Sequence, residues 1–247
     1  MVGRRGRRVM IALVLVSAAG CGVVGEAGRL PGRHETHGEK AAAGGASAVV
    51  SLRRAVLLGR SDQGRPISAV ELGNPRAARR VLVVGCVHGD EPAGVPVAEE
   101  LADGPSPADA DLWVVPSLNP DGLAAGTRGN AHGVDLNRNF PGGWRWIDEP
   151  GSIHYSGAGP LSEPESVSAT RLIRRVRPTV AIWFHQHMAV VDVSEGPKRV
   201  EQAFAGDVGL PSRALTDYPG SVTGWENTVV RDSAFVVELP RGATCRT

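Results

Sequence analysis

The chain has almost no excess of either charge, few aromatic side chains, few cysteines and no long apolar run. Its 247 residues carry a formal net charge of +1 and only 4% Phe, Trp and Tyr. A near-neutral balance gives no basis for nucleic acid or another acidic polymer as a partner. The longest apolar run, Val9–Val16, is too short to span a bilayer as a permanent helix. The 42% hydrophobic content is enough for one core of ordinary domain size.

The N-terminal segment has the pattern of an export signal. Arginines crowd residues 4–8, the apolar run follows, and small residues lead to Cys21. A basic region, a short apolar region and a small-residue cleavage site define a secretory signal. Cys21 after Ala-Ala-Gly resembles a bacterial lipidation site, although Ala18 stands where Leu is usual. We expect residues 1–20 to be a lipoprotein-type signal peptide and the protein to be exported and lipid-anchored through Cys21; plain secretion and an uncleaved anchor are alternatives.

Beyond the signal, the composition separates a linker from a folded domain. Residues 21–50 are rich in Gly, Ala and charge without a sustained apolar period, which is typical of a flexible linker. Residues 51–247 form the predicted catalytic domain. Cys86 and Cys245 remain for a disulfide in an oxidising compartment. Their pairing stays open, because sequence separation does not tell whether the Cα atoms approach to about 6 Å.

An uninterrupted apolar run, Val81–Val87, predicts a strand that is buried on both faces. His88 and Glu91 follow it, just before the helical pattern Pro92–Leu101. In open α/β sheets, ligands bind beyond the carboxyl ends of the strands. We therefore expect an α/β fold, a single domain with a mixed, mostly parallel central sheet flanked by helices, and a metal site at its carboxyl edge.

Two further apolar runs, Thr179–Phe184 and Ser233–Val237, end in His185 and Glu238. Imidazole and carboxylate groups are good zinc ligands. A carboxylate at the end of an apolar strand is costly unless it is solvated or paired with a cation. The joint occurrence of these residues with His88 therefore favours a functional site over separate surface positions.

The segment from Asp111 to Phe140 carries a different kind of chemistry. An apolar strand ends in the turn signal Asn119-Pro-Asp-Gly. The loop that follows is dense in Asn and Arg, including Arg128, Asn137 and Arg138. Arginine offers a planar fork for carboxylate, and asparagine supplies a neutral donor beside it. This loop is suited to binding an anion.

These motifs, taken in order, resemble the M14 zinc carboxypeptidase family, closest to the short bacterial murein peptide amidase branch, whose members are γ-D-glutamyl-diaminopimelate amidase-like. The resemblance runs from about residue 52 to the C-terminus, and Leu58–Ile67 is similar to the family's entry hairpin. The motifs that carry it are His88-Gly-Asp-Glu91, Asn119-Pro-Asp-Gly122, Arg128, Gly133-Val-Asp-Leu-Asn137-Arg138-Asn-Phe140, Phe184-His185 and Val237-Glu238-Leu-Pro240.

The resemblance implies one zinc ion per chain, held by His88, Glu91 and His185. His187 competes with His185, because it lies one strand repeat further on the same predicted face; His185 is preferred since it directly follows the strand. Glu238 resembles the general base, which takes the proton of the attacking water and passes it to the leaving amine.

The remaining implied roles concern the substrate. Arg128 resembles the residue that polarises the scissile carbonyl, and Asn137 with Arg138 resembles the pair that binds the terminal carboxylate. Asp135 and Asn139 are expected to be structural partners of that loop. Tyr218 resembles the tyrosine of a mobile loop that covers the substrate. The specificity wall is expected near residues 222–224, which carry no charge and therefore argue against a pocket for a basic side chain.

We predict an exported zinc metallocarboxypeptidase that hydrolyses an amide bond next to a C-terminal carboxylate. Its expected substrate is a peptide or muropeptide, such as a cell-wall stem peptide cut at a γ-D-glutamyl–diaminopimelate bond. An aspartoacylase-like N-acyl amino acid amidohydrolase is the second hypothesis, and an inactive domain that binds cell wall is the third. The preference for D- or L-residues and the oligomeric state stay open.

Overall fold

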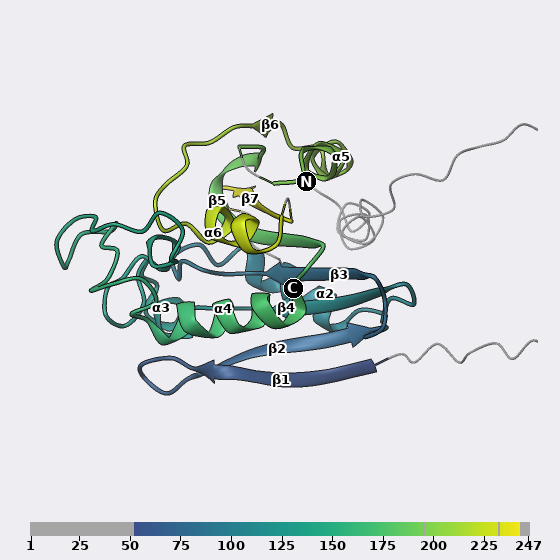
Figure 1. The fold of residues 1–247 in the computed structure, drawn as a ribbon, viewed down its shortest axis with the longest axis horizontal. Coiled ribbons are helices and arrows are strands. Elements are labelled where there is room, and N and C mark those ends of the chain that lie inside the picture. The colour runs from purple at the N-terminus through teal and green to yellow at the C-terminus, as the bar shows by residue number, and fades with distance from the viewer. Residues whose placement is uncertain (1–51, 195, 232, 243–247) are drawn as a thin grey trace, which may run out of the picture.

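In a computed structural model, the described part of the chain is an α/β domain built on one mixed sheet of seven strands (Figure 1). The structure describes residues 52–194, 196–231 and 233–242. The predicted signal peptide, the linker and Cys245 lie outside the described residues, so these expectations remain untested. Within the described ranges, no helix is both long and apolar enough to cross a membrane. The predicted fold class is confirmed.

The strands run in the order β1-β2-β4-β3-β5-β6, and β7 pairs with β5. The hairpin β1–β2 and the β2–β4 pair are antiparallel, while β3–β4, β3–β5, β5–β7 and β5–β6 are parallel. The sheet is therefore mostly parallel, as predicted. The strands are β1 Leu52–Arg60, β2 Pro66–Gly73, β3 Arg79–Val84, β4 Ala110–Val115, β5 Val180–Asp192, β6 Ser212–Arg213 and β7 Ala234–Pro240.

Helices cover both faces of this sheet. One core lies between the sheet and α4 and α6, and the other lies between the sheet and α2 and α5. Figure 1 shows α4 lying across one face of the sheet. The helices are α2 Gly94–Asp103, α3 Pro120–Ala125, the 3-10 turn η1 Leu136–Arg138, α4 Pro164–Val176, α5 Lys198–Val208 and α6 Val222–Val229.

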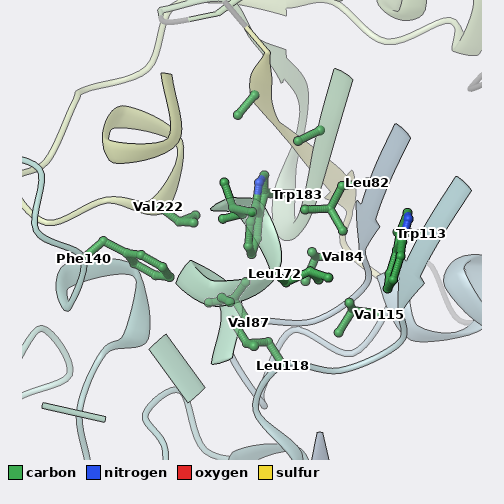
Figure 2. Close-up of a cluster of buried hydrophobic side chains, with 14 of the residues drawn as sticks. Leu82, Val84, Val87, Trp113, Val115, Leu118, Phe140, Leu172, Trp183 and Val222 are labelled. Carbon is green, nitrogen blue, oxygen red and sulfur yellow. The ribbon is translucent and has the colours of Figure 1, made fainter. Parts of the chain in front are cut away.

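Alternation along the central strands sends side chains into both cores. In β3, Leu82 and Val84 belong to the core under α4 and α6, whereas Val81 and Val83 belong to the opposite core. Successive side chains of a strand point to opposite faces, so an uninterrupted apolar run is what a strand covered on both sides requires. Figure 2 shows the first core, where Trp183 of β5 lies centrally.

The strand ends differ in detail from the sequence prediction. The strand after residue 78 ends at Val84, before His88, whereas β5 and β7 continue through His185 and Glu238 instead of stopping at them. The predicted turn at Asn119 is instead the start of α3, because the Asn119 side chain accepts a hydrogen bond from Gly122 N–H and caps the helix. These differences shift element bounds and leave the predicted site at the same edge of the sheet.

Strand β5 doubles back after His187. His185 pairs with Glu238 in parallel register, but Val190 also pairs with Glu238, and Val191 pairs with Val237. The second half of β5 therefore runs back along β7. Ala189, at the reversal, has φ of 54°, in a region that residues with a Cβ rarely adopt.

His187 pairs with Pro240 two register positions beyond the His185–Glu238 pair, so it continues on the face of β5 that carries His185. His185 is buried, whereas His187 is exposed and its Nε2 contacts Arg241. The regular register ends directly after His187, because a register shift begins between His187 and Met188.

A buried acid lies in the core beneath β5. Glu226 of α6 is fully buried, and its Oε2 accepts a hydrogen bond from Trp183 Nε1 at 2.9 Å. Burial disfavours the charged form and raises the pKa of Glu226 from 4.5 to about 8. Between pH 4.5 and about pH 8, Glu226 keeps its proton in the folded chain and loses it in the unfolded chain. This group therefore lowers the free energy of unfolding as the pH rises.

Glu226→Gln should therefore flatten the pH dependence of stability. The amide is uncharged at every pH and still accepts the Trp183 hydrogen bond. We expect similar stability at pH 4.5 and a more stable variant above pH 8, by at most about 5 kcal/mol, since each pKa unit corresponds to about 1.4 kcal/mol. Urea unfolding across this range measures the difference.

Glu99→Gln is the matched control, because Glu99 is exposed on α2. It should keep the wild-type pH slope. Parallel pH profiles for wild type and Glu226→Gln would contradict a neutral buried acid.

Candidate active site

The site lies at the carboxyl edge of the central strands. In β5, Ala181 and Trp183 face the core under α4 and α6, so His185 continues on that face; in β7, Ala234 and Val236 do the same for Glu238. His185 and Glu238 are register partners on neighbouring strands. Strand pairing therefore brings together two residues that are far apart in sequence.

His88 and Glu91 lie on the turn between β3 and α2. Glu91 N–H donates to His88 O at 3.0 Å, and the Cys86 thiol donates to the same carbonyl at 3.1 Å. Gly89 lets this turn pack against the first turn of α3: a Cβ there would lie 1.9 Å from the carbonyl carbon of Gly122. Cys86 is buried, which raises the pKa of its thiol to about 12.

Three donor atoms converge at one point. His88 Nδ1 and His185 Nδ1 lie 3.2 Å apart, and Glu91 Oε2 lies 3.1 Å from the first and 2.9 Å from the second. Zinc bonds of about 2.0–2.1 Å in a tetrahedral arrangement put ligand atoms roughly 3.3 Å apart. Within the described ranges this trio is the cluster whose geometry suits a metal ion, and its separations fit zinc.

The electrostatics of this trio also favour a cation. Burial opposes protonation of His88, but Asp135 and Glu91 outweigh it and raise the pKa of His88 to about 9. Burial likewise opposes the charged form of Glu91, but hydrogen bonds from His185 and His88 prevail and hold its pKa far below the ordinary value. The trio carries a negative potential, which a metal ion would neutralise.

Asp135 was expected to be a structural partner of its loop. In the structure it also bonds to His88 and Arg128. This fully buried carboxylate accepts a hydrogen bond from His88 Nε2 at 2.9 Å through Oδ1, while Oδ2 accepts from Arg128 Nε and Nη2. A carboxylate on the second ring nitrogen fixes the orientation of a metal-binding histidine. Asn139 does hold the loop, since its amide donates to Ser156 O, Gly159 O and Ser162 Oγ.

Arg128 stands beside the trio. Its Nη1 donates to Glu91 Oε1 at 3.0 Å, in addition to the two bonds to Asp135. A guanidinium group has five N–H donors, so further donors remain for a substrate oxygen in the cleft that Arg128 lines.

Arg138 is a buried cation without a fixed counterion. Only 5% of its surface is exposed, and no salt bridge joins it to a carboxylate among the described residues. Its Nη1 donates to Asn137 O, and its guanidinium lies 4.1 Å from the centroid of the exposed Tyr218 ring. Burial lowers the pKa of Arg138. A buried charge of this kind is stabilised by an anionic partner, such as a substrate carboxylate.

The donor trio, Arg128 and Arg138 line one open cleft of about 770 Å³. The sequence-predicted residues that line it are His88, Glu91, Arg128, Asn137, Arg138, His185, Tyr218 and Glu238. One solvent-accessible space therefore holds three donor atoms at the spacing of zinc ligands, a carboxylate next to them and a buried arginine. This arrangement suits hydrolysis of a bond close to a carboxylate.

The specificity wall was expected near residues 222–224, and its role stays a prediction. These residues are the first turn of α6, capped by Ser221, and Val222 is fully buried, with its N–H donating to Asn137 Oδ1. Thr223 does line the cleft. The prediction also missed a charge: Asp192 from the returning half of β5 lines the same cleft.

The comparisons with known proteins agree with this architecture. Residues 106–195 match the zinc carboxypeptidase family model, Peptidase_M14. The chain is 33% identical over 182 residues to murein peptide amidase A of Escherichia coli K12, covering 68% of this chain and 74% of that protein. The chain belongs to the zinc carboxypeptidase family, and it is a peptide hydrolase.

The chain is also similar to two further proteins, one in structure and one in sequence. The crystal structure of the murein-tripeptide amidase of Escherichia coli O157 superposes with a TM-score of 0.63 at 30% identity, covering 76% of this chain and 83% of that one. A γ-D-glutamyl-L-diamino acid endopeptidase of Lysinibacillus sphaericus is 24% identical over 240 residues, covering 75% of this chain and 60% of that protein. The predicted family and its murein amidase branch are confirmed.

Proposed function

We propose that this protein is a zinc-dependent amidase that hydrolyses the γ-D-glutamyl–diamino acid bond of cell-wall stem peptides. One observation carries the proposal: the His88–Glu91–His185 trio opens into the same cleft as Glu238 and the buried Arg138. The similarity to murein amidases supports this substrate class. The diamino acid in the name of the Lysinibacillus relative agrees with it.

In this proposal His88, Glu91 and His185 hold one zinc ion per chain. The ion supplies a Lewis acid that polarises a carbonyl group and lowers the pKa of water. Asp135 keeps His88 in the orientation and tautomer that leave Nδ1 free to bind, because it accepts from Nε2. Glu91 is fixed by Arg128 on one oxygen and by Gln186 N–H on the other.

The chain's own groups then handle protons and charge. Glu238 takes a proton from water as the water oxygen adds to the scissile carbonyl carbon, and it returns the proton to the nitrogen as the C–N bond breaks. The free donors of Arg128 stabilise the carbonyl oxygen as it becomes negative. Products are a carboxylic acid and an amine, so one water molecule balances the reaction.

Substrate anchoring falls to the buried arginine. Arg138 binds the carboxylate of the residue released, with Asn137 beside it, and the Tyr218 ring closes over them. Support comes from the Arg138 guanidinium, which has no fixed carboxylate partner within the described ranges and stacks on Tyr218. A charge-assisted pair in a partly dry cleft orients the scissile bond as well as binding it.

We also propose that the enzyme works outside the cytoplasm, tethered to the membrane through a lipid on Cys21. The basic region, apolar run and small residues before Cys21 support export. The linker over residues 21–50 would then let the catalytic domain reach wall peptides away from the bilayer.

A panel of substrates tests the activity. Purified, zinc-loaded protein should release diaminopimelate from the L-alanyl-γ-D-glutamyl-diaminopimelate tripeptide, as followed by mass spectrometry. N-acetyl-aspartate and other N-acyl amino acids should be stable, since they represent the amidohydrolase alternative. Absence of any hydrolysis at full zinc occupancy would refute the proposal and leave a wall-binding domain as the better hypothesis.

A further inference from the structure

His154 lies at the cleft, on the loop between η1 and α4. Its side chain is half-buried and lines the cleft, yet its Nδ1 atom is buried and forms no hydrogen bond among the described residues. That atom lies 3.7 Å from Asp135 Oδ2. Because the buried edge of the ring faces Asp135, the exposed edge, which carries Nε2, is turned toward the cleft.

Main-chain hydrogen bonds fix the loop that carries His154. Asp135 N–H donates to Tyr155 O at 2.8 Å, and Tyr155 N–H donates to Ser152 O at 3.2 Å. Ser152 Oγ also accepts from His154 N–H at 3.3 Å. The loop therefore holds His154 next to Asp135 without any hydrogen bond from the imidazole ring.

Asp135 Oδ2 links His154 to Arg128. This oxygen accepts a hydrogen bond from Arg128 Nη2 at 3.0 Å, and His154 Nδ1 lies 3.7 Å from it. Since both nitrogen atoms approach the same oxygen at these distances, they are less than about 7 Å apart. His154 therefore stands beside the guanidinium group that binds the scissile carbonyl in the proposed reaction.

The proposed substrate carries a negative charge close to that carbonyl. A γ-linked glutamyl residue uses its side-chain carboxyl group in the scissile bond and keeps its α-carboxylate free. Four carbon–carbon bonds of about 1.5 Å join the two carboxyl carbons, so these atoms are at most roughly 5 Å apart. The α-carboxylate can therefore reach His154 while Arg128 holds the carbonyl oxygen. Both nitrogens of an imidazolium ion are donors, so the ring can bond to Asp135 and to a ligand carboxylate together.

We propose that His154 determines specificity on the amino side of the scissile bond, by binding the free α-carboxylate of the γ-glutamyl residue. The inference deepens the proposed function and rests on it for the identity of that residue. It assigns a second substrate carboxylate, in addition to the one that Arg138 binds in the proposed reaction. Arg241 is the competing cation in the cleft, but among the described residues no hydrogen bond or ion pair joins it to Asp135.

His154→Ala tests the proposal, because it removes the ring and leaves the main-chain hydrogen bonds of the loop in place. The substrates are L-alanyl-γ-D-glutamyl-diaminopimelate and the same tripeptide with a carboxamide in place of the α-carboxylate. We expect wild type to prefer the carboxylate. The ratio of the two kcat/KM values should fall about 10- to 100-fold in the variant, since a hydrogen bond between charged groups is lost.

Arg241→Gln is the matched control, since Arg241 is exposed and also lines the cleft. It should keep the wild-type ratio. Loss of the ratio in Arg241→Gln with retention in His154→Ala would assign the carboxylate to Arg241 and overturn the proposal. A purely structural role of His154 would lower both kcat/KM values by the same factor, and an unchanged ratio would therefore also overturn it.

Binding separates this inference from the proposed reaction. Calorimetry of the zinc-loaded protein with L-alanyl-D-glutamate and L-alanyl-D-isoglutamine should show a preference for the first in wild type that His154→Ala lacks. If no γ-glutamyl peptide is cleaved but this preference exists and depends on His154, the proposed reaction fails and the role of His154 stands. If wild type cleaves the carboxylate and carboxamide tripeptides equally well, the reaction stands and the role of His154 is refuted, whether or not the variant folds.

Discussion

Glu238→Gln should abolish turnover and leave zinc binding intact. The amide matches the carboxylate in size and hydrogen-bonding reach but cannot accept the proton of water, so kcat should fall about 10²- to 10⁴-fold. Glu238 is outside the trio of converging donor atoms, so zinc content should remain one per chain. Steady-state kinetics on the stem tripeptide and metal analysis of the same sample measure both quantities.

Glu99→Gln controls for loss of one carboxylate. Glu99 is exposed on α2, and its amide variant should have wild-type kcat. If Glu238→Gln retained more than a tenth of wild-type kcat, another group would have to be the base. A parallel loss of zinc would instead mean that Glu238 acts through the metal site.

His185→Ala should remove zinc binding. Zinc held by protein ligands is bound by about 10–16 kcal/mol, so the loss of one ligand from a set of three costs on the order of 3 kcal/mol or more. That corresponds to at least about a 100-fold weaker affinity, and activity at limiting zinc should vanish with it. Competition with a fluorescent chelator gives the dissociation constant.

His187→Ala is the matched control for that variant. The two histidines are two residues apart, but His187 is exposed and contacts Arg241 instead of the trio. Its alanine variant should bind zinc as wild type does. The opposite result, with loss of zinc in His187→Ala and retention in His185→Ala, would exclude the ligand set His88, Glu91 and His185.

The sequence was sufficient to predict the strands that carry the site and the residues near their ends, because the apolar pattern of a strand is a local signal. Apolar runs located β3, β5 and β7, and each run led to a candidate residue: His88, His185 or Glu238. In a mostly parallel sheet the carboxyl ends share one edge, so these residues had to approach each other. The family resemblance then supplied the roles that spacing alone does not give.

Contacts that depend on three-dimensional packing were not predictable. Asp135 meets His88 across 47 residues, and nothing in its local sequence separates that role from loop support. Asp192 enters the cleft only because β5 reverses at Ala189 with positive φ, a conformation for which sequence gives no warning when the residue is alanine. The α6 start was accessible in principle, since Ser221 is a preferred N-cap residue.

Because β5 reverses, both halves of one strand contribute side chains to the cleft. Its outgoing half holds His185 and its returning half holds Asp192, with exposed Met188 between them. Insertions or deletions at the exposed bend would slide the returning half along β7 while the metal ligand keeps its register. The length of this bend therefore sets which part of the returning half lines the cleft beside β7.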